Sequence, residues 1–553
     1  MQFLVVPGAG APADVARVGA KAAGLIDASN EGLPVPPFFV LSIDLFRAWR
    51  ATGALPAELD AELDAGLEHL ARATGKRLGD ASAPLIVSVR SGAPVSMPGM
   101  LDTLLDVGAT SASVDGLAAQ LGDRAVALDV RRRFLESWGA VVGRLSRTRF
   151  DPRAGVRVAA RATTPPPPIT PADLEAKIAR HEQTLREAGV LPPDDARAQL
   201  RMAIEAILAS WDRDRARDFR ATQRIDDALG TAVVVQAMVF GNASGASGSG
   251  VAFTRHPVTG EKHLFGEYLP RVQGDEVVGG RASPAGLSAA ASGRRAAESL
   301  ERQSPTAFAD LERIAMALEA RYGDAQDLEI TVEHGTLWLL QVRTAKRSPR
   351  AAIRVAVDLV REGRIDRETA LARLDPRAID ALVSRALPPD DQLPEPPLTI
   401  GVPASPGAVS GRAVYDPTAA VELAARGEAA ILIRPECSPE DAPGIRAAAG
   451  VLTSSGGLTS HAAVIARALG RPCIVSASEV RVDVDHAYAE VRRPAGVVVP
   501  VPETITLDGA TGRVFAGALP LATTFALPEA REVLEWARDL ATPGWEDAIA
   551  RLL

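Results

Sequence analysis

The chain has 553 residues, which predicts several domains because a single hydrophobic core rarely grows beyond about 250–300 residues. Its 47% hydrophobic and 24% charged residues are typical of a soluble globular protein, and a net charge of −8 argues against general binding to nucleic acid or anionic membranes. Two cysteines, Cys437 and Cys473, exclude a disulfide framework. The N-terminus lacks the basic segment of a signal peptide, and no run reaches the ~18 apolar residues of a membrane span. We therefore expect a cytoplasmic protein.

Strands and helices are predicted to alternate over the first 345 residues. β-branched runs predict strands at 85–91, 231–240, 327–332 and 336–342, the last two forming a hairpin around Glu333-His334-Gly335. Apolar residues at helical spacing predict helices at 172–187 and 196–211.

Two proline-rich breaks divide the chain, at 165–168 and at 387–406. Amphipathic helices are expected at 350–385, just before the second break. Short apolar strands and glycine turns follow as far as Gly517, and the last segment, 527–553, has a helical pattern.

The segment TSSGGLTSHAAVIARALGRPCIV (453–475) carries the clearest chemistry. Its two glycines allow a tight turn, and Thr459 or Ser460 is suited to cap the following helix, which places His461 at the helix N-terminus. Free N–H groups and the positive end of the dipole favour a phosphorylated imidazole there. A lone histidine in such a place is more often only a polar residue of a helix cap.

The neighbours of His461 change that balance, because GGLTSHAAVIAR resembles the mobile phosphohistidine domain of the phosphoenolpyruvate-utilising enzymes. ILIRPECSPEDAPGIRAAAGVLTS upstream and TITLDGATGRVFAG at 504–517 resemble the same domain. The resemblance implies that His461 carries a phosphoryl group. Ser455 stands where the pyruvate phosphate dikinases usually have arginine, and Thr459 where plant members are phosphorylated for regulation, although capping is the favoured role for Thr459 here. Arg467 and Arg471 are interpreted as either phosphate-side cations or surface charges.

The first 345 residues resemble the ATP-grasp domain of the pyruvate phosphate dikinases in several segments. These are VGAKAAGLIDASNEGLPVPPFFVLS (18–42), IVSVRSGAPVSMPGMLDTLLDVG (86–108), QAMVFGNASGASGSGVAFTRHPVTGEKHLFGEYLPRVQGDEVVGG (236–280) and AQDLEITVEHGTLWLLQVRTAKR (325–347). The nucleotide-binding residues that the resemblance implies are Lys21, Arg90, Gln236, Met238, Val239, Glu267, Gln341 and Arg343. Arg90, Arg343 and His461 are the implied catalytic residues.

A magnesium site is expected at Asp327 and Glu329, with Gln341 as a further oxygen ligand. The two carboxylates lie two residues apart on a predicted strand, so they point to the same side. Two carboxylates beside a phosphate chain suit Mg²⁺. An isolated Asp-x-Glu on a strand is more often a solvated edge, but the Gln-x-Arg of the next strand favours the metal site.

The fold expected is a multidomain α/β protein: an ATP-grasp nucleotide-binding region and a swivelling β/α phosphohistidine domain. The predicted boundaries are 1–345 for the ATP-grasp region (with a helical subdomain near 110–215), 346–395 for a helical linker, 396–517 for the swivelling domain and 518–553 for a helical tail.

The resemblance implies that Mg-ATP donates its β-phosphoryl group to His461, with release of AMP and, through inorganic phosphate, pyrophosphate. The family's (β/α)₈ barrel, which binds pyruvate, needs about 250 residues, and we expect it on a separate polypeptide. Two alternatives stay open: a different protein or small-molecule acceptor, and a regulator that binds nucleotide without turnover. Neither nucleic acid nor membrane is expected as a partner.

Overall fold

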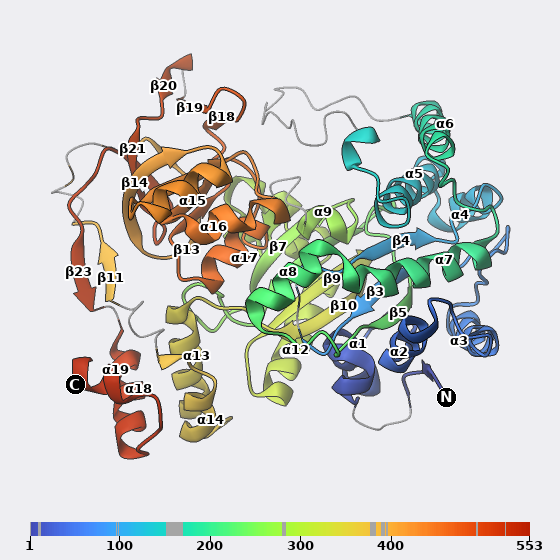
Figure 1. Cartoon of the computed structure of the whole chain (residues 1–553), viewed down its shortest axis with the longest axis horizontal. Coiled ribbons are helices and arrows are strands. Elements are labelled where there is room, and N and C mark those ends of the chain that lie inside the picture. The colour runs from blue at the N-terminus through green and yellow to red at the C-terminus, as the bar shows by residue number, and fades with distance from the viewer. Residues whose placement is uncertain are drawn as a thin grey trace. The chain divides into compact units, whose positions relative to one another are not determined.

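The structure is a computed structural model (Figure 1), which describes all residues except 1, 9–12, 96, 98, 151–169, 279–283, 377–382, 389–392, 394–395, 494–495, 526 and 553. The described residues form two compact units. The first unit takes in residues up to Gly248 together with Glu329–Arg343, and the second takes in Ser249–Leu328 and the residues from Thr344 onward. Within the described part of the chain, no helix has both the length and the apolar character needed to cross a membrane.

The first unit is built on a five-stranded sheet with the order β1-β2-β5-β3-β4. Its neighbouring strands are antiparallel. The strands are β1 (Leu4–Val5), β2 (Phe38–Leu41), β3 (Val87–Gly92), β4 (Thr103–Val107) and β5 (Ala232–Ala237). The strand predicted at 231–240 is thus shorter than expected: β5 ends at Ala237, and one further hydrogen bond, from the Met238 amide to the Ile86 carbonyl, continues its register with the segment before β3.

Helices cover the sheet of the first unit. They are α1 (Val15–Asn30), α2 (Ile43–Thr52), α3 (Leu59–Thr74), α4 (Val114–Leu121), α5 (Arg124–Val141), α6 (Pro171–Glu187), α7 (Ala196–Ala209) and α8 (Asp214–Gln223). The helix predicted at 172–187 is confirmed as α6, which starts with a capping box between Thr170 and Asp173. The helix predicted at 196–211 is confirmed as α7 followed by a short 3₁₀ turn.

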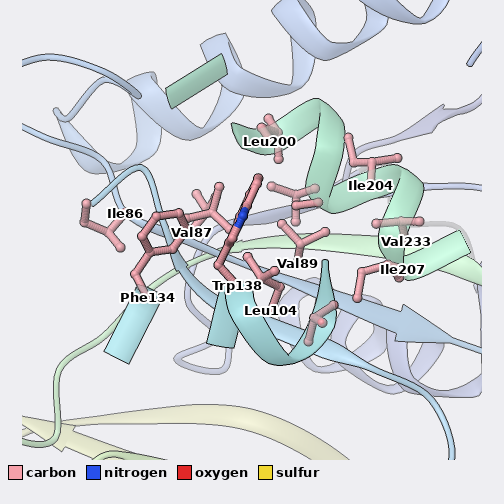
Figure 2. Close-up of a cluster of buried hydrophobic side chains, with 14 of the residues drawn as sticks. Ile86, Val87, Val89, Leu104, Phe134, Trp138, Leu200, Ile204, Ile207 and Val233 are labelled. Atoms are coloured by element: carbon pink, nitrogen blue, oxygen red, sulfur yellow. The ribbon is translucent and has the colours of Figure 1, made fainter. Parts of the chain in front are cut away.

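The main core of this unit lies between one face of the sheet and the helices α5 and α7. Figure 2 shows Val87, Val89 and Val233 of the sheet packed against Trp138 of α5 and Ile204 of α7. All five side chains are fully removed from solvent. Since side chains alternate along a strand, the residues between these valines face the other side of the sheet. That second face is the one available for a binding site.

A second sheet has the strand order β10-β9-β6-β7-β8. Its strands are β6 (Gly248–Phe253), β7 (Phe265–Pro270), β8 (Ala285–Gly286), β9 (Gln326–Glu333) and β10 (Thr336–Thr344). The predicted hairpin is confirmed between β9 and β10, and its two turn residues, His334 and Gly335, have φ angles of 49° and 82°. Positive φ at both positions is the requirement of the two-residue turn that matches strand twist. The helices α9 (Gly274–Val278), α10 (Ala289–Ser292), α11 (Leu300–Gln303) and α12 (Pro305–Tyr322) belong to the second unit.

An eight-stranded sheet forms the core of residues 399–516, with the order β12-β22-β21-β14-β15-β16-β17-β13. The strands are β12 (Thr399–Ile400), β13 (Val402–Ser405), β14 (Ala408–Val414), β15 (Ala430–Arg434), β16 (Gly450–Thr453), β17 (Cys473–Val475), β21 (Thr504–Asp508) and β22 (Arg513–Ala516). The four central strands, β14 to β17, are parallel. Because β12 and β13 belong to this sheet, the end of the proline-rich break at 387–406 is part of the sheet.

Each face of this sheet is covered. The helices α15 (Pro417–Ala425), α16 (Ala442–Ala447) and α17 (His461–Ala468) share one apolar cluster with it. A small sheet of β18 (Val480–Asp483), β19 (Tyr488–Arg492) and β20 (Val498–Pro500) contributes to the cluster on the other face. The prediction of a mixed α/β, multidomain fold is confirmed.

The predicted linker and tail come together in one helical cluster. Helices α13 (Pro349–Arg361) and α14 (Arg367–Ala372) bury their apolar faces against α18 (Pro528–Asp539) and α19 (Glu546–Leu552). The prediction of helix throughout 350–385 is wrong at its end, where β11 (Val383–Ala386) pairs antiparallel with β23 (Ala522–Phe525). The proline run at 165–168 and part of 387–406 lie outside the described residues.

Candidate active site

Arg90 lies on β3, on the face of the first sheet opposite the core of Figure 2. Its neighbour Val89 points into that core, so the Arg90 side chain projects to the other side. The guanidinium donates hydrogen bonds to the Leu340 carbonyl at 3.0 Å, to Gln236 Oε1 at 3.3 Å and to Gln341 Oε1 at 3.4 Å. Three strands, β3, β5 and β10, therefore bring predicted site residues together around one planar cation.

Lys21 is positioned by a break in α1 at Gly19. Gly19 has φ 80° and ψ 157°, which interrupts the helix two residues before the lysine. A Cβ at Gly19 would lie 2.1 Å from the Gly92 carbonyl oxygen, so only glycine allows α1 to approach the end of β3 this closely. The Ala20 amide then donates to the Ala93 carbonyl at 2.9 Å. These contacts hold the half-buried Lys21 beside the site.

The electrostatic surroundings of Lys21 disfavour its charged form. Its pKa is lowered from 10.5 to about 7, mainly by burial; the neighbouring Arg90 and Arg343 also lower it, and Glu329 opposes them. A lysine in this state gains a proton readily when an anion binds beside it.

Glu329 is the carboxylate that pairs with these cations. Its two oxygens lie 3.5 Å from Arg90 Nη2 and 3.8 Å from Arg343 Nη2. With Lys21 protonated, three cations surround Glu329. Such a cluster, with bidentate guanidinium groups, suits the oxygens of a polyphosphate.

Three of the predicted nucleotide-binding residues, Gln236, Met238 and Val239, lie on β5 or just beyond its end. Gln236 is buried, and its Nε2 donates to the Pro36 carbonyl at 3.2 Å while its Oε1 accepts from Arg90. Met238 and Val239 lie just beyond the end of β5, and the Met238 amide donates to the Ile86 carbonyl at 2.9 Å. Val239 is almost fully buried. The structure thus brings Gln236 into the cation cluster, whereas no contact to that cluster is found for Met238 or Val239 in the described part of the chain.

The oxygen donors fit a magnesium ion on chemical grounds. Asp327 and Glu329 are two residues apart on β9, so they project from the same face of that strand, and Asp327 is buried. No cluster of three or more His, Cys, Asp or Glu is found among the described residues. A pair of carboxylates without a complete protein cage is the donor set of Mg²⁺, which keeps water and substrate phosphate in its other positions.

His461 is the first residue of α17, which follows β16 through the loop 454–460. The Ser460 side chain accepts a hydrogen bond from the Ala463 amide at 3.5 Å and caps the helix. His461 therefore lies at the carboxyl edge of the parallel strands, where ligands of open α/β sheets commonly bind. Its half-buried ring makes no hydrogen bond to any other residue described by the structure.

The His461 imidazole is kept in its neutral form. Burial lowers its pKa below 6.5, and the nearby carboxylates of Glu440 and Asp441 only partly offset that effect. Asp441 belongs to a capping box with Ser438 and pairs with Arg434 at 3.3 Å. A neutral imidazole has the free lone pair that a nucleophile needs.

Glu267 contacts the loop that leads into His461. Its Oε1 accepts from the Leu458 amide at 2.7 Å, and its Oε2 accepts from the Thr459 hydroxyl at 3.3 Å. A Cβ at Gly457 would lie 2.3 Å from the same carboxylate. A nucleotide contact was expected for Glu267, but in the structure its carboxylate accepts hydrogen bonds from the loop before His461.

Two expectations about that segment are corrected. Thr459 does not cap the helix: Ser460 does, and the Thr459 hydroxyl is directed to Glu267. Arg467 is not a surface charge, since it is only 1% exposed, whereas Arg471 is exposed. Ser455, in the place of the usual arginine, donates its hydroxyl hydrogen to the Pro435 carbonyl at 2.8 Å.

The sequence carried a signal for Arg467 that motif comparison missed. Ala462, Ala463 and Ala466 recur at helical spacing and are buried, and Arg467 continues that stripe. An arginine on the apolar face of a short helix is a buried cation with internal partners. The pairing of Glu267 with the loop has no such signal, because the two are separated by 191 positions.

Two segments of the chain match known protein families. Residues 51–308 match the pyruvate phosphate dikinase AMP/ATP-binding domain, and residues 427–512 match the mobile domain of the PEP-utilising enzymes. The pyruvate, phosphate dikinase of Rhizobium meliloti (strain 1021) is 39% identical over 532 residues, covering 96% of this chain and 59% of the relative. Pyruvate, phosphate dikinase 2 of Oryza sativa subsp. japonica is 38% identical, with 95% and 58% covered. Pyruvate, phosphate dikinase 1, chloroplastic, of Arabidopsis thaliana is also 38% identical, with 97% and 53% covered.

The chain spans between 53% and 59% of the length of these three relatives. With two domains matched in one chain and an alignment over nearly all of it, this chain is similar to the pyruvate phosphate dikinases and to the PEP-utilising enzymes.

Proposed function

We propose that this chain transfers the β-phosphoryl group of ATP to His461, as the phosphohistidine-forming part of a pyruvate phosphate dikinase. The observation that carries the proposal is the cluster of Lys21, Arg90 and Arg343 around the carboxylate of Glu329. Three cations in one place suit the oxygens of a polyphosphate. The second support is a neutral histidine at a helix N-terminus in the domain that matches the mobile domain.

In this proposal the three cations bind and neutralise the phosphate chain. Arg90 is held by four hydrogen bonds, so it binds phosphate oxygens without first having to be ordered. Arg343, 37% exposed at its side chain, is the cation with freedom to follow the charge that develops during transfer. Asp327, Glu329 and Gln341 would hold Mg²⁺, which when bound neutralises phosphate charge and orients the chain.

The chemistry at His461 proceeds in two displacements. A ring nitrogen of His461 attacks the β-phosphorus, the bond from that phosphorus to the α–β bridging oxygen breaks, and AMP leaves with the oxygen and the electron pair. An oxygen of inorganic phosphate then attacks the γ-phosphorus, the bond to the β–γ bridging oxygen breaks, and pyrophosphate leaves. The β-phosphoryl group remains on His461 for an acceptor. In-line attack at each phosphorus needs positioning rather than further covalent catalysis.

The final acceptor in this proposal is pyruvate. The relatives are named pyruvate, phosphate dikinases, and the chain aligns with little more than half of each of them. A different protein or small-molecule acceptor would use the same phosphohistidine. Adding pyruvate, with and without a barrel protein, to the phosphorylated chain separates the two.

The proposal is tested by incubating the protein with ATP, Mg²⁺ and phosphate and measuring intact mass under alkaline conditions, which preserve phosphohistidine. We expect one added phosphoryl group and an equal amount of AMP. His461→Ala should abolish both. His486→Ala is the matched control, because His486 is an exposed histidine of the same domain, paired only with Asp483. ATP binding without AMP formation would instead favour a nucleotide-binding regulator.

A further inference from the structure

Arg467 is a charged side chain that the proposed chemistry does not use. It lies on α17, six residues after His461, and is only 1% exposed. Burying a guanidinium is costly unless its hydrogen bonds and its charge are both compensated. The residues that compensate Arg467 therefore indicate what it does.

The hydrogen bonds of Arg467 hold the loop before His461. Nη2 donates to the Leu458 carbonyl at 2.7 Å, and Nη1 donates to the Ala404 carbonyl at 3.2 Å. The amide N–H of the same Leu458 donates to Glu267 at 2.7 Å. Leu458 is thus bound at its carbonyl by its own domain and at its amide by β7 of the nucleotide-binding region.

The charge of Arg467 is compensated from outside its own helix. The carboxylates whose fields act on it are Glu267, on β7, and Asp327, on β9. Its Nε has no hydrogen-bond partner among the residues described. The attraction of the buried cation to Glu267 favours the arrangement of the loop in which Glu267 contacts Leu458 and Thr459.

We propose that Arg467 is a positioning residue for His461, which fixes the 457–460 loop through the Leu458 carbonyl while Glu267 fixes the amide of the same residue. The inference rests on the proposed function, since it describes how the phosphate-accepting histidine is placed. Arg467 touches neither His461 nor phosphate in this role. Its effect passes through the loop and the Ser460 cap to the first residue of α17.

The test compares Arg467→Lys with Glu267→Gln and with the double variant. Lysine keeps the positive charge, but it lacks the planar guanidinium with which Arg467 donates to the Leu458 and Ala404 carbonyls at once. Arg471→Ala is the matched control, an exposed arginine four residues further along the chain. Three quantities are measured: the single-turnover rate of His461 labelling from ATP, the ATP concentration at half-maximal rate, and hydrogen exchange at the Leu458 and Thr459 amides.

We expect Arg467→Lys and Glu267→Gln each to slow labelling by about tenfold, the effect of losing one charge-assisted hydrogen bond. The half-maximal ATP concentration should change less than about twofold, because Arg467 does not bind ATP. Both variants should exchange the Leu458 amide faster than wild type. The labelling rate of the double variant should be at most about twofold below that of the slower single variant, because both substitutions remove the same restraint on the loop. Arg471→Ala should match wild type in all three measurements.

Wild-type labelling and loop protection in Arg467→Lys would overturn the proposal, as would fully additive effects in the double variant. If Arg467→Lys does not fold, Glu267→Gln with normal loop protection overturns it. If wild type itself is not labelled, the proposed function fails, and hydrogen exchange of the loop still decides the role of Arg467.

Discussion

The two halves of the proposed reaction are built in opposite ways. The cation cluster gathers side chains from Lys21 to Arg343, and only buried strands and a broken helix bring them together. The phosphohistidine site consists of one continuous segment, 456–467, in which a turn, a cap and the histidine follow one another. The first site is rigid and positively charged; the second is a short loop whose charged neighbours, Glu440 and Asp441, are acidic.

That difference assigns distinct tasks. The dispersed site is suited to hold a highly charged polyphosphate, because its charges are fixed in place before the ligand arrives. The continuous segment is suited to carry one group away, because little else needs to move with it. Substitutions in the cation cluster should therefore alter how well the charge of the nucleotide is neutralised. Substitutions in segment 456–467 should alter the position of His461.

The largest effect is expected for Arg343→Met. This side chain is partly exposed and its ion pair with Glu329 is long, at 3.8 Å, so its loss should leave the fold intact. Labelling of His461 should nonetheless slow by about a hundredfold, the usual effect of removing one charge that stabilises the transition state. Stopped reactions with labelled ATP measure the rate, and Arg17→Met, an exposed arginine of α1, is the control. A loss below about threefold would remove Arg343 from the reacting centre.

Gly457→Ala is expected to have the next largest effect, in the continuous site. The added Cβ would lie 2.3 Å from the Glu267 carboxylate, so the loop and β7 could no longer meet as they do. We expect labelling to slow by about tenfold, the effect of losing the Glu267 hydrogen bonds. ATP affinity and the melting temperature should stay near wild type. Wild-type labelling would show that this contact does not accompany transfer.

Proton uptake distinguishes the cation cluster from an ordinary basic surface. Lys21 has a pKa of about 7, so at pH 8 it is mostly neutral, and a bound polyphosphate should raise its pKa and draw in about one proton. Calorimetric titration with ATP in buffers of different ionisation enthalpy measures this number. Lys21→Met should remove the uptake. In the free protein, stability should rise with pH between about 7 and 10.5, because the unfolded lysine holds its proton longer.

The smallest expected effect is the pH dependence of His461 itself. Its pKa is lowered below 6.5, so the neutral nucleophile already predominates at pH 7. At saturating ATP, labelling should change by less than about twofold between pH 7 and pH 8 from this source. A steep rise over that interval, persisting in Lys21→Met, would mean that His461 is protonated at neutral pH and that its environment differs from the one described.

The same contrast explains what the sequence could predict. The helix start and the position of His461 follow from local rules, because caps and turns depend on neighbouring residues, but these rules favoured Thr459 where Ser460 is the cap. The strands β3 and β9 were predictable from their β-branched runs. What local rules cannot supply is the meeting of Glu267 with Leu458, since it depends on tertiary packing of distant segments. The strand β11 was missed for a similar reason: Val383–Ala386 is extended because β23 pairs with it, 136 or more positions later.

The fate of the ATP phosphates tests the central claim most directly. The protein would be incubated with Mg²⁺, phosphate and ATP labelled at either the β- or the γ-phosphorus, and the label on protein and in small molecules compared. The account predicts that β-label stays on His461, that γ-label appears only in pyrophosphate, and that AMP forms in equal amount. Retention of γ-label on the protein, with ADP as the product, would contradict it and indicate an ordinary single-phosphoryl kinase.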